Sequence, residues 1–266
     1  MPTAFIADVE FTWGHASRQI GLSKSPPSFL YPPPTTIIGA VAASMAKRNN
    51  WGEKAGREVM ALLGSKLLAI SVKPLNFIPI RFQDVNRIVT VKVTSGVTYP
   101  QPKGLTRSFD APARGKTVFA TLNDEPPVMR IALVFSDTSF KGVNLQEDDF
   151  WRINRIGAKE AVVSVLDVRS VEVEGEKGEF LTSWSFPLVK GVTPLKEVMG
   201  EWTIESYLNP FSSRSYQKPY SLITGEADLL DFMVPRSLVK PKYRVSVDKG
   251  ASAFDLDGEV VIGIEF

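Results

Sequence analysis

A proline- and aromatic-rich segment that runs directly into an apolar helix is the most constraining feature of this 266-residue chain. The segment reads Ser25-Pro-Pro-Ser-Phe-Leu-Tyr-Pro-Pro-Pro-Thr-Thr-Ile-Ile-Gly-Ala40. Proline fixes φ and keeps the preceding residue extended, so Tyr31–Pro34 is expected to form a short polyproline-type rod. Thr35 or Thr36 is then expected to cap the helix. The segment therefore predicts a positioning element rather than a catalytic one.

The helix that follows should bury one face. Ile37, Val41 and Met45 recur every four residues, and Gly39 leaves room for a close neighbour. We expect this helix to run from residue 36 to about 49 and helical structure to resume over 53–63. Gly64 is expected to stop the second helix, because glycine readily adopts the left-handed conformation of a helix end.

The hydrophobic pattern in the rest of the chain predicts further strands and a helix. Strands are expected at 4–13, 66–74, 128–136 and 161–168, and a short helix at 144–156. Asn144 is its expected cap, and Gly157 its expected left-handed end. The resulting order, strand, helix, strand, excursion, strand, helix, strand, is that of a βαββαβ ferredoxin-like (RRM-like) domain. We therefore predict an α+β fold with this domain at 1–178, an insertion at about 78–127, and a smaller β-rich part at 179–266 packed on it.

Two stretches resemble one family in the right order. The first strand, the basic Ser-rich loop and Tyr31-Pro-Pro-Pro-Thr-Thr-Ile-Ile-Gly-Ala40 resemble the start of the fifth CRISPR-associated (Cas) protein family, of the RAMP superfamily. Arg155-Ile-Gly-Ala-Lys-Glu-Ala-Val-Val-Ser-Val165 resembles a loop and strand that the family carries later. The resemblance covers roughly residues 1–50 and 145–170 well.

The resemblance implies a non-catalytic RNA-binding subunit of a type I surveillance complex (Cascade), similar to the type I-A member. Such a subunit holds the 5′ handle of a CRISPR RNA (crRNA) and functions in antiviral defence. Its implied partners are the backbone subunit, the large subunit and, through the assembled complex, target DNA. Residues 81–116 of the insertion are implied to act as a thumb that clamps the first guide segment against the backbone subunit.

The insertion is also where positive charge gathers. The whole chain has a net charge of only +2. Residues 81–116 nevertheless carry seven Lys or Arg residues against two Asp, a local surplus of five. A basic arm suits a nucleic-acid backbone, although a solvated hairpin face has the same composition.

Single-stranded RNA is held by charge on its phosphates, by stacking of its bases on flat side chains, and by backbone amides. In Arg155-Ile-Gly-Ala-Lys159 a flexible backbone lies between two cations, although the same loop also suits a plain helix end. Tyr31 is either a stacking residue or a packing residue. The candidate RNA-binding residues are Arg18, Lys24, Tyr31, Arg107, Arg114, Lys116, Arg155, Gly157 and Lys159.

The sequence gives little support to an enzymatic function. His15 is the only histidine, and metal-independent ribonucleases usually need a general acid and a general base, so we expect His15 to touch RNA or solvent. The alternative is a metal-independent endoribonuclease that processes CRISPR repeat RNA with His15 as a catalytic group. A third possibility is a protein-only assembly module. No nucleotide-binding, hydrolase or metal-ligand motif appears, so no metal or cofactor is expected.

Cellular location is constrained only weakly. The chain has no cysteine, which excludes disulfides and thiolate metal sites. Its start has no basic segment followed by a long apolar core, and no window approaches ~18 uninterrupted apolar residues. We therefore expect a cytoplasmic protein without a signal peptide or a membrane partner.

Overall fold

The structure is a computed structural model that describes residues 1–19, 27–52, 55–85, 88–89, 92–94, 97–99, 109–110, 113–217, 227–237 and 240–265; for residues 84–114 only backbone is described. Within these residues the chain is α+β, with mostly antiparallel sheets and few helices, as the sequence predicts. No helix among the described residues is long and apolar enough to cross a membrane.

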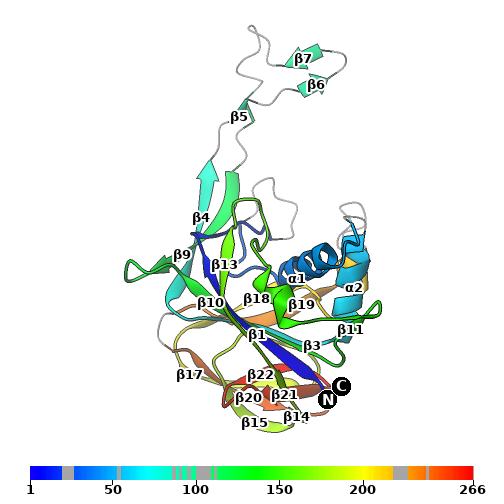
Figure 1. Cartoon of the computed structure of the whole chain (residues 1–266). Helices are drawn as coiled ribbons and strands as arrows, with labels where there is room; N and C mark the ends of the chain where they lie inside the picture. The colour runs from blue at the N-terminus through cyan, green and yellow to red at the C-terminus, as the bar shows by residue number, and fades with distance from the viewer. Residues whose placement is uncertain are drawn as a thin grey trace.

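A four-stranded antiparallel sheet forms the centre of the molecule (Figure 1). Its strand order is β13-β1-β10-β3, and the strands are β1 (Thr3–Phe11), β3 (Leu67–Pro74), β10 (Val128–Phe135) and β13 (Val163–Glu172). All three pairings are antiparallel, and β1 and β10 lie in the middle. The four strands expected from the sequence are therefore the four strands of one sheet, which brings β1 and β13 side by side.

Helices cover one face of this sheet. They are α1 (Pro34–Arg48), α2 (Gly56–Lys66) and α3 (Glu147–Trp151), and a short α4 (Arg214–Gln217) packs on α2. Ile37, Val41 and Met45 are fully buried in the core between α1 and the sheet, as their spacing predicts. Phe5 and Phe150 stack within this core, with ring centroids 4.9 Å apart.

Two predicted features of the first helices are wrong. Helix α1 begins at Pro34 with Pro33 at the cap position, and no side chain caps it, so neither Thr35 nor Thr36 is the cap. Proline at the first helical position is favourable because its fixed φ is already helical. Gly64 does not stop α2, which continues to Lys66. An added Cβ at Gly64 would lie 2.3 Å from Cε2 of Tyr216, so this glycine permits close packing instead.

The predicted helix at 144–156 is also shorter than expected. Gln146, not Asn144, is the cap of α3, and Gln146 and Asp149 form a reciprocal capping box. Arg48 of α1 binds the buried Asp149 carboxylate through two hydrogen bonds of 2.6 and 2.8 Å. The helix ends at Trp151, so Gly157 lies in the loop beyond and does not end it. Gly157 does have the expected positive φ, +101°.

The opposite face of the sheet is covered by strands from the C-terminal part. Ala4 and Ile6 of β1 pack there against Trp184, Phe254 and Val261. Three three-stranded sheets form this part, ordered β14-β21-β22, β15-β20-β17 and β16-β19-β18. Their strands are β14 (Gly175–Glu176), β15 (Gly178–Thr182), β16 (Phe186–Pro187), β17 (Val192–Met199), β18 (Trp202–Leu208), β19 (Leu229–Pro235), β20 (Lys242–Val247), β21 (Ala251–Asp255) and β22 (Val260–Ile264). The domain boundary at 178 remains a prediction.

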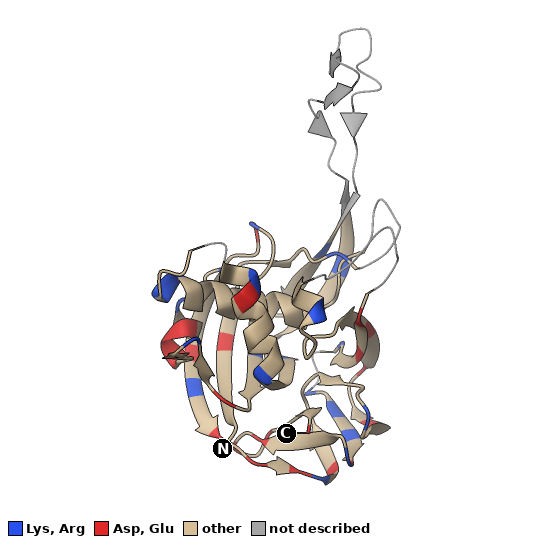
Figure 2. Cartoon of the chain, turned by 90° about the vertical axis from the view of Figure 1, so that its right-hand side faces the viewer, with Lys and Arg blue, Asp and Glu red and all other residues tan. Residues whose placement is uncertain are grey.

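A long hairpin projects from the body on the side away from the small sheets β14-β21-β22 and β15-β20-β17 (Figure 1). Its strands, β4 (Phe77–Val85) and β9 (Ala113–Thr121), pair antiparallel along their whole length, and β2 (Gly14–His15) adds to the other side of β9. The remaining short strands are β5 (Ile88–Val89), β6 (Lys92–Thr94), β7 (Val97–Tyr99), β8 (Phe109–Asp110), β11 (Ser139–Phe140) and β12 (Val143–Asn144). Lys and Arg positions are spread over the described body rather than gathered in one block (Figure 2).

Candidate nucleic-acid interface

The loop that contains Gly157 lies against the first turn of α1. A Cβ added to Gly157 would lie 3.5 Å from Cγ2 of Thr36 and 3.6 Å from Oγ of Ser17. The fold therefore brings together the proline-rich helix start, the loop after β2 and the Arg155–Lys159 loop. These are the segments that the sequence analysis singled out separately.

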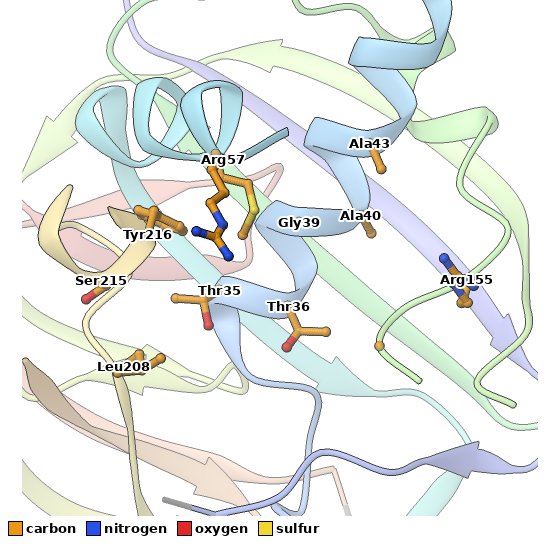
Figure 3. A pocket seen from close by; sticks show the side chains of 12 residues that line it. Thr35, Thr36, Gly39, Ala40, Ala43, Arg57, Arg155, Leu208, Ser215 and Tyr216 are labelled. Carbon is orange, nitrogen blue, oxygen red and sulfur yellow. The ribbon is translucent and has the colours of Figure 1, made fainter. Parts of the chain in front are cut away.

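A pocket of about 420 Å³ opens where these segments meet. Figure 3 shows Arg57, from α2, reaching toward Thr35 on one side of the first turns of α1, with Arg155 on the other side. The lining residues are Thr35, Thr36, Gly39, Ala40, Ala43, Arg57, Met60, Arg155, Gly157, Leu208, Ser215 and Tyr216. Small residues along α1 leave the helix backbone accessible between the two arginines.

The electrostatics of this pocket favour an anion. Residues 32–34 are prolines, so Thr35 carries the first backbone N–H of α1. The first turn has no acidic side chain to offset the positive end of the helix dipole. Arg57 and Arg155 are exposed and have no ion-pair partner among the residues that the structure describes. The pocket is thus bordered by two guanidinium groups, by the hydroxyls of Thr35 and Thr36 and by a helix N-terminus. Such a set of groups suits a phosphate.

The depression continues along α1. A second pocket of about 660 Å³ shares Ala43 and Arg155 with the first and adds Lys47, from the last turn of α1, and Asn50, just beyond the helix. Arg155 therefore lies where the two pockets join. An extended polyanion lying along α1 would meet cations at the start, the middle and the end of this groove.

The turn between β1 and β2 connects this groove to the hairpin. Trp13 donates a hydrogen bond from Nε1 to the carbonyl of Glu160, 2.7 Å away, next to Lys159. Lys116 of β9 lies over the Trp13 ring, with Nζ 5.9 Å from the ring centroid. Arg18 is exposed and pairs through its backbone with Ser28. A cationic and aromatic surface thus extends from the hairpin base to the glycine loop.

Tyr31 is not part of this surface, which corrects the prediction of an RNA contact. Its side chain is fully buried, and its hydroxyl donates a 2.8 Å hydrogen bond to the carbonyl of Pro235. Burial raises its pKa well above the usual value, and the Glu205 carboxylate adds to the effect. The rod of prolines holds Tyr31 in the core instead of presenting it to solvent.

His15 is likewise buried rather than exposed in a loop. It lies in β2, and its Nε2 is 3.3 Å from the carbonyl of Leu30, a distance that suits donation from the neutral tautomer. Burial lowers its pKa from 6.5 to about 4. The expectation that His15 touches RNA or solvent is therefore wrong.

A buried carboxylate beside these residues joins three parts of the chain. Glu205 of β18 accepts hydrogen bonds from the Leu30 N–H at 2.9 and 3.0 Å and from the Tyr207 hydroxyl. Arg81 of β4 forms an ion pair with the same carboxylate. The base of the hairpin, the segment before α1 and β18 are thereby fixed relative to one another.

Comparison with solved structures places the chain in a family. A CRISPR protein from Archaeoglobus fulgidus, known from its crystal structure, is 38% identical to it over 99% of this chain and 100% of the other, with a TM-score of 0.74. The chain belongs to the same family of CRISPR proteins. No protein-family model matches this CRISPR protein, and no curated protein matches it at a significant level.

Two further solved structures match this CRISPR protein with a TM-score of 0.44. One is a chain of the type III-B Cmr-β complex bound to cognate target RNA and AMPPnP, at 9% identity over 90% of this chain and 86% of that chain. The other is a chain of a CRISPR RNA-guided surveillance complex, at 14% identity over 90% and 91%.

Several predicted contacts of this CRISPR protein stay predictions. Lys24 and Arg107 lie outside the described residues, as does the side chain of Arg114. Lys159 is exposed in the loop next to Gly157. Arg57 was missed, because nothing in its local sequence distinguishes it from any arginine at the start of a helix. Only the packing of α2 against α1 and α4 places it at the groove. No cluster of potential metal ligands occurs among the described residues.

Proposed function

We propose that this CRISPR protein is a non-catalytic RNA-binding subunit of a type I surveillance complex and that it holds the 5′ handle of a crRNA. The observation that carries the proposal is the pocket between Arg57, Arg155 and the uncapped start of α1. Phosphate is the anion that such a constellation favours, and single-stranded RNA presents phosphates at regular intervals. Membership of a CRISPR protein family supports the assignment to RNA-guided defence.

We further propose that the central sheet and its helices are a ferredoxin-like domain. If β1, β3, β10 and β13 are numbered 1 to 4 along the chain, their order across the sheet is 4-1-3-2. All neighbouring strands are antiparallel. Helices α1 and α2 connect the first two strands, and α3 connects the last two. This arrangement supports the βαββαβ assignment.

The hairpin is proposed to act as a thumb that clamps the first guide segment against the backbone subunit. Its projection from the body and its local surplus of cations support this role. The large subunit is the proposed second neighbour, and target DNA is reached through the assembled complex. The proposed setting is the cytoplasm, and no cofactor is required.

Two rival functions make different predictions. In the endoribonuclease, His15 would act on the RNA. His15 is fully buried, which weighs against this role. In the protein-only assembly module, the cationic surface would bind acidic partners. Cleavage of repeat RNA is expected only of the endoribonuclease. Salt-sensitive RNA binding is expected of the proposed subunit and of the endoribonuclease, but not of the assembly module.

The decisive experiment is to purify the tagged protein from its native cell and to sequence any RNA that accompanies it. The proposal expects small RNAs that share one repeat-derived 5′ end, together with the backbone and large subunits. A preparation that contains those subunits but no RNA would favour the assembly module. Accumulation of uncut precursor in a His15→Ala strain would favour the nuclease.

A further inference from the structure

A separate pocket lies at the foot of the hairpin and shares no lining residue with the two pockets of the groove along α1. Its volume is about 440 Å³, within the range of roughly 300–1,000 Å³ that is typical of small-ligand sites. The lining residues are Leu30, Ile78, Pro79, Ile80, Arg81, Glu201, Thr203 and Arg236. The pocket is therefore apolar on one side and charged on the other.

The apolar side is the free edge of β4. In the hairpin sheet the strand order is β2-β9-β4, so β4 has no strand partner on its outer side among the described residues. Ile80 on this strand is 47% exposed, which is high for an isoleucine and leaves apolar surface uncovered. Pro79 lies in the middle of this edge. A proline in an edge strand normally directs its missing N–H outward, so the edge is a poor template for an added peptide strand.

The charged side comes from the C-terminal part. Arg236 follows β19, and its backbone N–H donates a 2.8 Å hydrogen bond to the carbonyl of Glu201, which holds the two residues together. The Arg236 side chain is exposed and has no ion-pair partner among the residues described. Arg81 is different, because the buried Glu205 carboxylate engages and fixes its guanidinium. Arg236 is thus the cation available to a ligand, and Glu201 lines the same pocket.

We propose that this pocket takes one unstacked base of a single-stranded RNA. The base packs on Ile78 and Ile80, Arg236 binds the adjacent phosphate, and Glu201 accepts a hydrogen bond from the base. This inference rests on the proposed RNA-binding function and adds a specificity-determining residue to it. Single-stranded RNA is usually recognised by packing its splayed bases on aromatic or arginine planes and by hydrogen bonds to their edges. Flipped bases also pack on apolar side chains, and here the two isoleucines supply that apolar wall.

The carboxylate of Glu201 gives the pocket a preference. Cytosine presents an amino group at position 4, which donates to a carboxylate, whereas uracil presents an oxygen at the same position. Two acceptors facing each other repel, and the two pyrimidines have nearly the same size and shape. Cytosine is therefore favoured over uracil by the contact at position 4. The two bases also differ at N3, which accepts in cytosine and donates in uracil, so the contact with the carboxylate is isolated by substituting Glu201 and not by the base comparison alone.

The test measures binding of fluorescent RNA dodecamers, all cytidine or all uridine, by anisotropy over a range of salt concentrations. The wild-type protein should bind the cytidine RNA about five- to tenfold more tightly. Glu201→Gln should bring the two affinities close together, because an amide both donates and accepts. Arg236→Ala should weaken both RNAs and lower the log–log salt slope by about 0.7, the loss of one phosphate contact. Both residues are exposed, so the melting temperature should not change.

The matched control is Arg244→Ala, which removes an exposed arginine from β20 in a different sheet and should leave affinity and slope unchanged. An unchanged cytidine preference in Glu201→Gln, with an unchanged slope in Arg236→Ala, overturns the pocket while leaving RNA binding intact. If the wild-type protein binds neither RNA, the proposed function itself fails. If Arg236→Ala impairs capture of partner subunits but leaves RNA affinity unchanged, the pocket is a protein contact and the inference is wrong.

Discussion

Arg81 of the hairpin and Glu205 of β18 form an ion pair in which the carboxylate side chain is 1% exposed and the guanidinium side chain 37% exposed. The pair lies at the boundary between the body and solvent. Because Glu205 also accepts from the Leu30 N–H and the Tyr207 hydroxyl, its negative charge is well compensated although it is buried. This arrangement connects the base of the projecting hairpin to the core.

Removal of this carboxylate should destabilise the fold. In Glu205→Ala the Leu30 N–H and the Tyr207 hydroxyl lose their acceptor in the interior. Leaving such groups unsatisfied costs about 1–3 kcal/mol, so the free energy of unfolding should fall by at least that amount. Urea denaturation measures it. Glu179→Ala, at an exposed position of β15, is the control and should be neutral within about 0.5 kcal/mol. Equal stability of the two variants would mean that the buried network contributes nothing.

Two glycines of α2 provide a matched pair. An added Cβ at Gly64 would lie 2.3 Å from Cε2 of Tyr216 and 2.9 Å from the carbonyl oxygen of Pro210, whereas at Gly56 it would meet no described atom within 4 Å. Gly64→Ala should lower stability by about 1–3 kcal/mol through overpacking. Gly56→Ala should raise it by about 0.5–1 kcal/mol, because alanine loses less backbone entropy in a helix. Thermal melts of both variants check the opposite signs.

Stability should decrease on mild acidification because of His15. Its pKa in the folded state is about 4 against 6.5 in an unfolded chain, so above pH 6.5 both states are neutral and the contribution of this residue is fully present. Between pH 6.5 and about 4 only the unfolded state takes up the proton, and the folded state loses up to about 3 kcal/mol. His15→Asn should lack this part of the pH dependence. Urea titrations at pH 7, 6 and 5 on both proteins measure the difference, and parallel profiles would contradict the assignment.

The groove along α1 yields a binding prediction. Arg57→Ala and Arg155→Ala should each weaken binding of handle RNA by about 1–3 kcal/mol, the usual size for charge-assisted hydrogen bonds, with nearly unchanged melting temperatures. Lys159→Ala should have a similar effect if the whole loop contacts RNA. Filter binding is the measurement. Arg169→Ala, which removes an exposed arginine paired with Asp257, is the control. If the variants lose stability but not RNA affinity, the loop is only a structural turn.

A substitution at Gly157 distinguishes the two interpretations of that loop, a structural turn or an RNA contact. Its φ of +101° disfavours any side chain, although an added Cβ would make only ordinary contacts with Thr36 and Ser17. Gly157→Ala should therefore cost about 1 kcal/mol in stability. An effect on RNA affinity beyond that of the stability loss would indicate that the loop backbone itself contacts the ligand.

The strands and the first helix were predictable because their signals are local. The four-residue recurrence from Ile37 to Met45 and the alternation in β1 report burial directly. The end of α3 was not predictable in this way. Its capping depends on Asp149, which is held by Arg48 from a distant helix, and no pattern within residues 144–156 contains that contact.

The candidate site was predictable in part. Both sequence motifs proved to border one pocket, but their meeting at Thr36 and Gly157 depends on the sheet order that places β13 beside β1. Tyr31 and His15 were misassigned because residue type alone does not distinguish a buried aromatic side chain from an exposed one. Arg57 and Arg236 were missed since each is brought to its pocket only by tertiary packing.

The burial of both faces of the central sheet has a consequence for how any RNA is bound. RRM domains stack bases on the open face of a four-stranded sheet. Here that face carries Ala4 and Ile6 against Trp184 and Phe254, and β22 lies so close that a Cβ on Gly263 would lie 2.0 Å from the carbonyl oxygen of Leu68. A nucleic acid is thereby restricted to the rim of the sheet: the loops, the helix start and the hairpin. In the proposed function, recognition is therefore expected at the perimeter of the molecule, where substitutions should change the ligand while leaving the core intact.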